Sequence, residues 1–424
     1  MNIALITYEF FPELGGIGQN FTSFCKIFNN KEQNLLVFNK YYKSKNIFNI
    51  LDRKENKYYK IKDLVTFIKN RKLIYYFFIA NWTIIKDNQT PFKYKIRMIL
   101  YLFLKTDILL KTLKNILMIH PFFKKVNIDI IMGSDCSGNI LPLIFILSKL
   151  FKTKCLSYGH GNDFLVRSRW SLKTYYLRML DKIIVSNQKT KNLIKTVNHL
   201  RENQIKIIPY GLILNEYEIN KSKQEIREAF KIPEEKFILL SVGRHVPRKK
   251  FDLVIKSIKI IKEKIPSLNL KYYLIGGGPQ TPYLKDLTNK LGLENYVEFL
   301  GAFGGLKKNM YLKLSDVFVM SSIALKESIE GFGIVFLEAN FYKVPVIGTK
   351  TGGISEAIIN GKTGFLIEPN NVNELVEKIL FLYKNKDLRK KMGKEGYNRV
   401  IISFNWEKIY NDYINTFEKI LNDY

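Results

Sequence analysis

Cysteine is scarce in this sequence of 424 residues. There are three cysteines, Cys25, Cys136 and Cys155, which is an odd number, and no two of them form a CxxC pair. The sequence therefore suggests neither a disulfide framework nor a cysteine-based zinc site. This cysteine usage fits a reducing compartment such as the cytoplasm.

Long hydrophobic runs are absent as well. The longest uncharged apolar run, LIYYFFIANWTII at residues 73–85, has 13 residues, too few for the roughly 20 that cross a bilayer. The first residues, MNIALITYEFFPELGG, have no basic leader and include Glu9 and Glu13. They therefore predict a first strand rather than a signal peptide. We expect a cytoplasmic protein without a spanning helix.

Acidic residues are few in the first half of the chain. Residues 1–208 contain 35 Lys and Arg against 13 Asp and Glu, whereas residues 209–424 contain 33 against 25. Residues 40–125 alone hold 20 basic and 5 acidic residues among Tyr, Phe, Ile and Leu. Such a surface attracts anions, so an acidic membrane, a nucleic acid or a phosphorylated substrate is a candidate partner. A compositional bias that only leaves solvated faces positive is the alternative.

An anionic membrane is the partner that we favour. A basic segment beside anionic lipid gains on the order of 1 kcal/mol per Lys or Arg. No helix-turn-helix, zinc-finger or RNA-binding aromatic signature supports a nucleic acid. Residues 93–119 mix cationic and apolar side chains at near-helical spacing, which suits a membrane interface. A helical pair packed on the domain, with lysine stems over apolar neighbours, explains the same pattern.

The chain exceeds the about 250–300 residues at which single cores usually divide, so we expect two domains. Short apolar strands alternate with helical stretches in two series, which predicts two doubly wound α/β domains. The predicted strands of the first series are residues 2–7, 34–39, 128–134, 154–159, 182–187 and 205–210. Those of the second series are residues 237–243, 270–277, 296–301, 316–322, 344–349 and 364–369.

These series set the predicted domain ranges. We predict an N-terminal domain at 1–208 with a basic aromatic insertion at about 40–125, and a C-terminal domain at 209–403. The boundary falls in the polar, turn-prone stretch PYGLILNEYEINKSK, residues 209–223. Residues 404–424 contain a final amphipathic helix.

Glycine-rich loops at strand ends are the places to look for a ligand, because doubly wound sheets bind ligands beyond the carboxyl ends of their strands. ELGGIGQN, residues 13–20, follows the first predicted strand and contains Gly15, Gly16 and Gly18. These glycines allow the backbone to approach a ligand, and the helix N-terminus that follows favours an anion. A tight structural turn explains the same glycines.

A second loop of this kind, SVGRHVPRKKFDLVI, spans residues 241–255. Gly243 turns the chain after a buried strand, and Arg244 and Lys249 follow before the next helix. Arg offers phosphate a planar fork and Lys a point charge, so the loop suits a diphosphate. A solvated basic loop is the alternative. IGGGP, residues 275–279, is a further glycine-rich strand end.

Two glutamates flank a glycine-rich turn in ESIEGFGIVFLEA. A helix that opens near Gly333 leaves Glu330 in the preceding loop and places Glu338 inside the helix. The GFG segment permits close approach, and a carboxylate accepts hydrogen bonds from neighbouring hydroxyls, as in sugars. Glu330 would suit a hexose and Glu338 a ribose. A helix-entry acid and a buried Glu paired with a Lys explain the same spacing.

Together with HGND at residues 160–163, VEFLG, SDVFVMSS and TGGISEAIINGKTGFLIEP, these segments resemble the family 4 retaining glycosyltransferases of the GT-B fold, in the family's order and over most of the chain. EGFGIVFLE matches the family's EX7E motif, with Glu330 first and Glu338 last. The final helix, with Trp406, resembles the one that crosses back to the N-terminal domain. The resemblance implies two Rossmann-like domains facing a central cleft. It implies that the N-terminal domain is acceptor-binding and the C-terminal domain is nucleotide-sugar-binding.

The resemblance also implies roles for single residues. The first motif glutamate would contact the donor sugar and the second the nucleotide ribose, while a basic pair would stabilise the departing diphosphate and a histidine would line the sugar end of the cleft. The implied catalytic residues are Arg244, Lys249, Glu330 and His160. The implied donor-binding residues are Gly15, Gly16, Phe332, Gly333 and Glu338.

Two positions depart from the family pattern. Lys250 stands where the family often has Gly after the lysine, which narrows that turn or adds charge. Gly277 stands where an acid is common, so recognition of the base is less defined there.

The implied activity is retaining transfer of a hexose from a UDP-sugar or GDP-sugar to a hydroxyl of a membrane-linked glycan or glycolipid. We expect this in bacterial surface polysaccharide or lipopolysaccharide synthesis, at the inner face of the cytoplasmic membrane. No DxD constellation stands out, so we expect no metal and no further cofactor. A phosphorolytic enzyme would need a pyridoxal phosphate lysine that cannot be identified. A non-catalytic basic protein that binds membrane or nucleic acid is the rival from another class.

Overall fold

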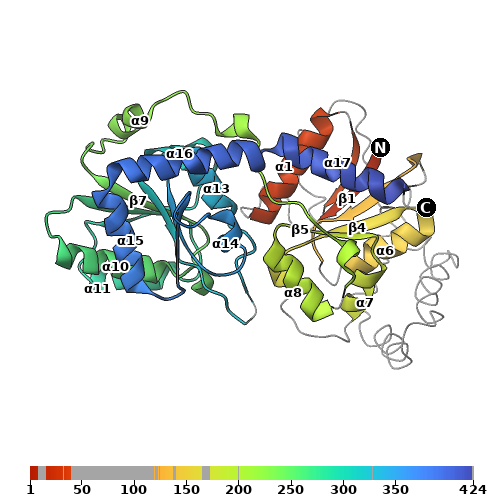
Figure 1. The fold of residues 1–424 in the computed structure, drawn as a ribbon, viewed down its shortest axis with the longest axis horizontal. Coiled ribbons are helices and arrows are strands. Elements are labelled where there is room, and N and C mark those ends of the chain that lie inside the picture. Colours follow the sequence, from red (N-terminus) through yellow and green to blue (C-terminus); the bar gives the residue numbers. More distant parts are fainter. Residues whose placement is uncertain are drawn as a thin grey trace, which may run out of the picture. The chain divides into compact units, whose positions relative to one another are not determined.

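The computed structural model describes residues 1–7, 16–31, 33–39, 119, 123, 125–136, 140–164, 172–198, 200–326 and 328–422. The chain divides into two compact units, whose elements are labelled in Figure 1. Unit 1 consists of Met1–Val185, Lys191–Ile208 and Tyr410–Tyr424, and unit 2 of Ser186–Thr190 and Pro209–Ile409.

Unit 1 contains a six-stranded parallel sheet in the order β2-β1-β3-β4-β5-β6. Its middle strands are apolar and buried, as expected for a parallel sheet covered on both faces. They are β1 (Asn2–Thr7), β2 (Asn34–Asn39), β3 (Ile130–Gly133), β4 (Lys154–Gly159), β5 (Lys182–Val185) and β6 (Ile205–Ile207). The helical elements in this part of the chain are α1 (Gly16–Asn30), α6 (Ile140–Phe151), η2 (Gly161–Phe164), α7 (Leu172–Met179), α8 (Gln188–Asn198) and η3 (Glu202–Gln204).

Unit 2 contains a second six-stranded parallel sheet, in the order β12-β11-β10-β7-β8-β9. Its strands are β7 (Phe237–Val242), β8 (Leu270–Ile275), β9 (Val297–Gly301), β10 (Val317–Met320), β11 (Val346–Thr349) and β12 (Gly364–Ile367). All twelve described strands lie inside the predicted ranges, which confirms the two doubly wound α/β sheets.

Helices cover both faces of the second sheet, with α10 and α11 on one side of β7 and α16 on the other (Figure 1). Helix α10 packs against α15, and α13 packs against α16. The helical elements are η4 (Leu214–Tyr217), α9 (Lys223–Ala229), η5 (Pro247–Lys249), α10 (Phe251–Lys264), α11 (Thr281–Lys290), α12 (Gly305–Leu314), α13 (Ile334–Phe341), α14 (Ile354–Ala357), α15 (Val372–Lys384), α16 (Lys386–Ser403) and α17 (Trp406–Asn422).

The final helix, α17, starts with residues of unit 2 and continues from Tyr410 with residues of unit 1. Within unit 1 its aromatic side chains pack on α1. The rings of Phe24 and Phe28 stack with centroids 4.0 Å apart, and Tyr413 meets Phe24 edge-on at 5.1 Å. The predicted amphipathic helix therefore buries its apolar face in the core of unit 1.

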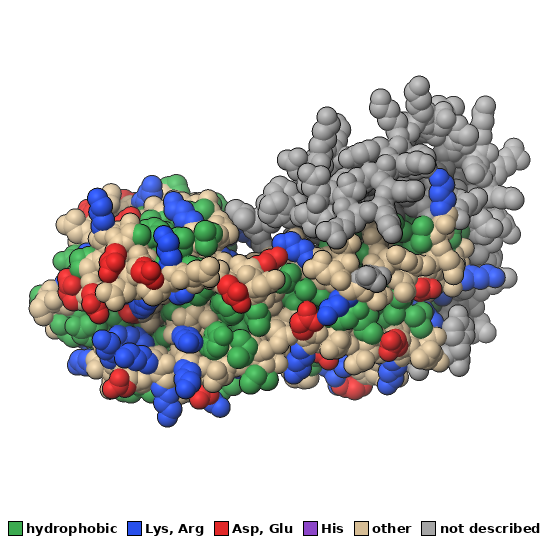
Figure 2. Space-filling view, turned by 90° about the horizontal axis from the view of Figure 1, so that it is seen from above, with side chains coloured by type: hydrophobic (Ala, Val, Ile, Leu, Met, Phe, Trp, Pro, Cys, Tyr) green, Lys and Arg blue, Asp and Glu red, His purple; other side chains and the backbone are tan. Residues whose placement is uncertain are grey.

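The predicted basic insertion at about 40–125 lies outside the described residues, apart from Ile119, Phe123 and Lys125. Among the helices that the structure describes, none combines the length and hydropathy that a bilayer crossing requires. On the face of the described part seen in Figure 2, Lys and Arg side chains lie among acidic and hydrophobic ones.

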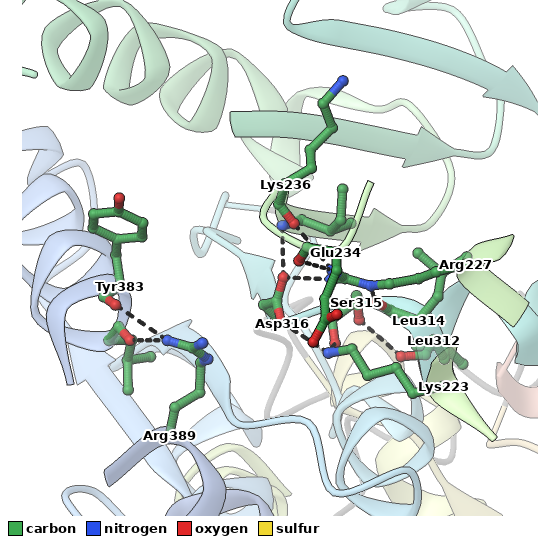
Figure 3. Close-up of polar contacts among 12 residues, drawn as sticks. Lys223, Arg227, Glu234, Lys236, Leu312, Leu314, Ser315, Asp316, Tyr383 and Arg389 are labelled. Carbon is green, nitrogen blue, oxygen red and sulfur yellow. Dashed lines mark hydrogen bonds and ion pairs between the residues drawn. The ribbon is translucent and has the colours of Figure 1, made fainter. Parts of the chain in front are cut away.

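An ion cluster joins the amino ends of β7 and β10 (Figure 3). Asp316 precedes β10, and its carboxylate accepts hydrogen bonds from Arg227 at 2.7 Å, Lys223 at 2.8 Å and the N–H of Ile238 at 2.8 Å. The Arg227 side chain is 7% exposed and also donates to three backbone carbonyl groups, those of Leu314, Glu234 and Lys236. The cluster holds α9 against the amino ends of these two central strands.

Replacement of Asp316 by Ala leaves the guanidinium of Arg227 buried without its carboxylate. We expect a loss of about 3–5 kcal/mol in the free energy of unfolding, measured by urea denaturation followed by circular dichroism. Asp286→Ala is the control, because its ion pair with Lys290 has side chains 56% and 71% exposed, and we expect a change below about 1 kcal/mol. Equal effects of the two variants would contradict a structural role for the cluster.

The same cluster predicts a pH dependence. Burial alone raises the pKa of Asp316, but the charges of Lys223 and Arg227 outweigh burial and hold the pKa below its usual value. The stabilisation is therefore complete above the unfolded-state pKa of about 3.9 and is lost as the pH falls through the lower folded-state pKa.

Candidate functional site

The strand order of unit 2 reverses between β7 and β10. From β7 the chain continues to β8 and β9 on one side, and β10, β11 and β12 then extend the sheet on the other side. Ligands of open α/β sheets bind beyond the carboxyl ends of the strands at such a reversal. The loops that leave β7 and β10 carry the GRHVPRKK and EGFG segments, so the topology brings the two predicted motifs to one place.

Glu330 forms the centre of this site. Its Oε2 accepts a hydrogen bond from Lys249 Nζ at 2.6 Å and another from the guanidinium of Arg248. The three side chains are only 10–12% exposed. Lys249 Nζ also lies 3.2 Å from Met320 Sδ, at the end of β10. A carboxylate and two cations are therefore assembled at the point where the sheet reverses.

Each charged group here favours the ionised form of its oppositely charged neighbour. Burial lowers the pKa of Lys249, and the neighbouring carboxylate of Glu330 opposes that shift. Burial raises the pKa of Glu330, but the charges of Lys249 and Arg248 outweigh burial and lower the pKa overall. Glu330 is therefore ionised at neutral pH and is an acceptor for hydrogen bonds only.

Backbone hydrogen bonds fix the short helix η5 that presents Arg248 and Lys249. The N–H of Ile323 donates to the Arg248 carbonyl at 2.8 Å, and the Ser321 hydroxyl donates to the Lys250 carbonyl at 2.7 Å. Lys250 has a φ of 49°, in the left-handed region that favours glycine and costs other residues about 1–2 kcal/mol. This conformation gives the physical reason why glycine suits this position.

Arg244, the other member of the predicted basic pair, lies near Lys249. It is exposed in the loop after β7, close enough to Lys249 for its charge to lower the pKa of that amine. Arg248 is the arginine that contacts Glu330. Sequence reasoning missed Arg248, although the run PRKK offered a signal, since consecutive basic residues on a tight turn bring neighbouring cations together.

Glu338 lies inside α13, whereas Glu330 lies in the loop before that helix, which confirms the predicted local structure. Glu338 is 2% exposed, and its Oε1 accepts from the Tyr217 hydroxyl at 2.8 Å and from Lys308 Nζ at 2.7 Å. This contact matches the alternative of a buried Glu paired with a Lys. The sequence offered no signal for Lys308 or Tyr217 as the partners.

The EGFG loop is held by a neighbouring glycine pair. The N–H of Gly353 donates to the Glu330 carbonyl at 3.0 Å, and Gly352, at a φ of 50°, leaves room for that carbonyl where a Cβ would lie 2.2 Å away. Phe332 is 2% exposed, and Gly333, at a φ of 82°, caps the start of α13. The TGGISEA segment therefore serves as a support for the loop that carries Glu330.

The remaining predicted residues belong to unit 1. His160 is 5% exposed, with its Nε2 2.9 Å from the Ser134 carbonyl, and its backbone N–H donates to Asp163 Oδ2 at 2.9 Å. Ser134 follows β3, and the strand order of unit 1 reverses between β1 and β3. Gly16 begins α1, while Gly15 lies outside the described residues.

A metal site in a protein needs several ligand side chains close together. Within the described ranges, no cluster of three or more His, Cys, Asp or Glu side chains could hold a metal ion. Around the two motif carboxylates, the structure assembles the cations of Arg248, Lys249 and Lys308.

Sequence comparison links the C-terminal part of the chain to a known family. Residues 222–399 match the family described as "Glycosyl transferases group 1". An uncharacterized glycosyltransferase of Methanocaldococcus jannaschii is 28% identical over 317 residues, which cover 70% of this chain and 77% of the relative. Several further curated relatives match over only 44–54% of their own length. These similarities support a group 1 glycosyltransferase.

Comparison with solved structures concerns the fold. A glycosyltransferase from Rickettsia africae has a TM-score of 0.73 at 18% identity, covering 100% of this chain and 99% of that one. HepE from Anabaena in complex with UDP-glucose has a TM-score of 0.70 at 17% identity, covering 98% and 99%. The two six-stranded parallel sheets and these neighbours show that the chain has the GT-B fold.

Proposed function

We propose that this protein is a retaining glycosyltransferase that moves a hexose from a nucleoside diphosphate sugar to a hydroxyl of an acceptor. The observation that carries the proposal is the buried group of Glu330, Lys249 and Arg248 at the reversal of the unit 2 sheet. Cations suit the diphosphate of such a donor, and a carboxylate suits the hydroxyls of its sugar.

The donor in this proposal is a UDP-sugar or a GDP-sugar. The neighbouring structure of HepE was solved with UDP-glucose, which supports a uridine nucleotide without deciding the base for this chain. Glu330 holds hydroxyls of the sugar, and Glu338 holds those of the ribose. The backbone N–H groups of Phe332 and Gly333 face the sugar and phosphate, and His160 contributes from unit 1.

In the proposed reaction, the bond between the anomeric carbon and the phosphate oxygen breaks first. Positive charge develops on the sugar and negative charge on the diphosphate, which Arg244 and Lys249 stabilise. The acceptor hydroxyl attacks from the face that the diphosphate leaves, and its proton passes to the departing phosphate oxygen. The new bond forms on the face of the old one, so the anomeric configuration is retained.

No metal and no further cofactor take part in this proposal, because fixed cations can neutralise the leaving group as a metal ion would. The acceptor is a lipid-linked glycan or glycolipid of a bacterial surface polysaccharide pathway. We place the reaction in the cytoplasm, at the inner face of the membrane, because the first half of the chain carries the larger cationic excess.

A donor screen tests the proposal as a whole. The purified protein is titrated with UDP- and GDP-sugars in the presence of EDTA, with Glu330→Ala alongside. We expect saturable binding and slow hydrolysis of one donor, both weakened in the variant. Loss of activity in EDTA with rescue by a divalent ion would overturn the metal-independent mechanism. No response to any donor by folded protein, with salt-dependent binding of duplex DNA, would favour the non-catalytic rival.

Lys249→Ala tests the assignment of the leaving-group cation. We expect kcat to fall about 100- to 1,000-fold, or about 2.7–4 kcal/mol, as for other positioned transition-state donors. Lys256→Ala is the matched control, since its amine pairs with Asp252 at 3.3 Å on α10 and its side chain is 47% exposed. Near-normal turnover of folded Lys249→Ala would show that the cationic site lies elsewhere.

Vesicle flotation tests the proposed membrane partner. We expect the protein to float with vesicles that contain anionic lipid and to remain unbound with neutral ones, and we expect binding to weaken as salt is raised, because exposed charges are screened. Absence of binding to anionic vesicles at low salt would remove the physical basis for the membrane-linked acceptor.

A further inference from the structure

A side chain from the first half of the sequence contacts the loop that carries Glu330. Asn187 belongs to unit 2 although it follows β5, and it is 1% exposed. Its Nδ2 donates to the Gly331 carbonyl at 2.5 Å and to Ser186 Oγ at 2.8 Å, and its Oδ1 accepts from the N–H of Thr190 at 2.8 Å. Gly331 directly follows Glu330, so this amide bonds to the backbone beside the candidate sugar-binding carboxylate.

The orientation of the Asn187 amide follows from its partners. Gly331 offers a carbonyl, which needs a donor, and Thr190 offers an N–H, which needs an acceptor. The reverse orientation would set oxygen against oxygen and NH₂ against N–H. Asn187 therefore has two separate tasks: it caps the start of α8 through Oδ1 and anchors the Gly331 carbonyl through Nδ2.

The segment around Asn187 is fixed in turn by α14. The carboxylate of Glu356 accepts from the backbone N–H groups of Gln188 and Lys189, each at 2.8 Å. Lys189 Nζ also donates to Ser355 Oγ at 2.9 Å. Three segments of unit 2, at residues 186–190, 330–333 and 351–357, are thus joined by hydrogen bonds.

Gly353 shows how closely these segments meet. A Cβ at this position would lie 1.9 Å from the Gly331 oxygen and 2.6 Å from Asn187 Nδ2, so only glycine fits. The carbonyls of consecutive residues are held from two sides, that of Glu330 by the Gly353 N–H and that of Gly331 by Asn187. The backbone that presents Glu330 therefore has little freedom to shift.

We propose that Asn187 is a positioning residue for glycosyl transfer. By fixing the Gly331 carbonyl it places the Glu330 carboxylate, and the N–H groups of Phe332 and Gly333, against the donor sugar. Asn187 acts through the loop and not by touching the donor. The inference rests on the proposed function and extends it to a residue that precedes the matched family region.

Asn187→Asp separates the two tasks of the side chain. An aspartate keeps the acceptor for the Thr190 N–H and is as good a helix cap as asparagine, but it has no hydrogen to donate to the Gly331 carbonyl. We expect kcat for transfer to fall about 10- to 100-fold, the scale of a small misplacement of a reacting group. Binding of UDP or GDP alone, measured by calorimetry, should fall much less than kcat, because UDP and GDP lack the sugar that Glu330 contacts.

Asn371→Asp is the matched control. Asn371 caps α15 by accepting from the Glu374 N–H at 3.0 Å, so the same substitution alters a helix cap of the same unit away from the Glu330 loop. We expect normal kcat and normal nucleotide binding. Equal kcat for Asn187→Asp and Asn371→Asp would overturn the inference, as would a fall in nucleotide binding that matches the fall in kcat, since that pattern reports general damage.

If Asn187→Asp does not fold, a second variant tests the inference. Glu356→Gln keeps the shape of the side chain that holds the 186–190 segment but removes the charge that accepts from Gln188 and Lys189. We expect a smaller fall in kcat, about threefold, with unchanged nucleotide binding, and an unchanged kcat would overturn the inference. If the unmodified protein binds and turns over no donor, the proposed function itself fails, whatever these variants do.

Discussion

The interaction on which the site depends is the burial of one carboxylate with two cations. Glu330, Arg248 and Lys249 are each almost removed from water, and an unpaired charge in such a place costs several kcal/mol. Burial of these three charges is therefore tolerated only if all three are present and the backbone keeps both cations within hydrogen-bonding distance of the carboxylate. This requirement explains the dense backbone hydrogen bonding on both sides, from Ser321 and Ile323 to η5 and from Gly353 to the Glu330 carbonyl.

The second motif acid, Glu338 in α13, is also buried together with its partners. Glu338 is more buried than Glu330 and shares its Oε1 between Lys308 and Tyr217. The two motif acids thus stand in separate ionic settings, one at the loop and one inside α13. The proposed donor carries both hydroxyls and a diphosphate, so it would use the carboxylates and cations of both settings.

The parts of this arrangement that follow local rules could be predicted from the sequence. Apolar runs bounded by turns marked all described strands, and the glycines before α13 marked the loop position of Glu330 and the helical position of Glu338. The partners of these acids could not be predicted, because they come from distant segments. Tyr217 and Glu338 are 121 residues apart, and Asn187 and Gly331 are 144 apart. The contact of Arg248 with Glu330 depends on the geometry of η5, which composition does not reveal. The roles of Gly15 and the basic insertion stay predictions.

Unit 2 consists of two separate segments of the chain, Ser186–Thr190 and Pro209–Ile409, and the ribosome synthesises the short one first. Residues 186–190 leave the ribosome well before the sheet of unit 2 exists, and their partners Gly331 and Glu356 emerge about 140–170 residues later. Until then the Gly331 carbonyl, which accepts from the Asn187 amide in the folded protein, has not been synthesised. A fragment that starts at Pro209 would retain all six strands of the sheet but would leave the Gly331 carbonyl and the Glu356 carboxylate without these donors. The sheet of unit 2 is thus continuous in the chain, whereas the loop of Glu330 is completed by a segment synthesised before it.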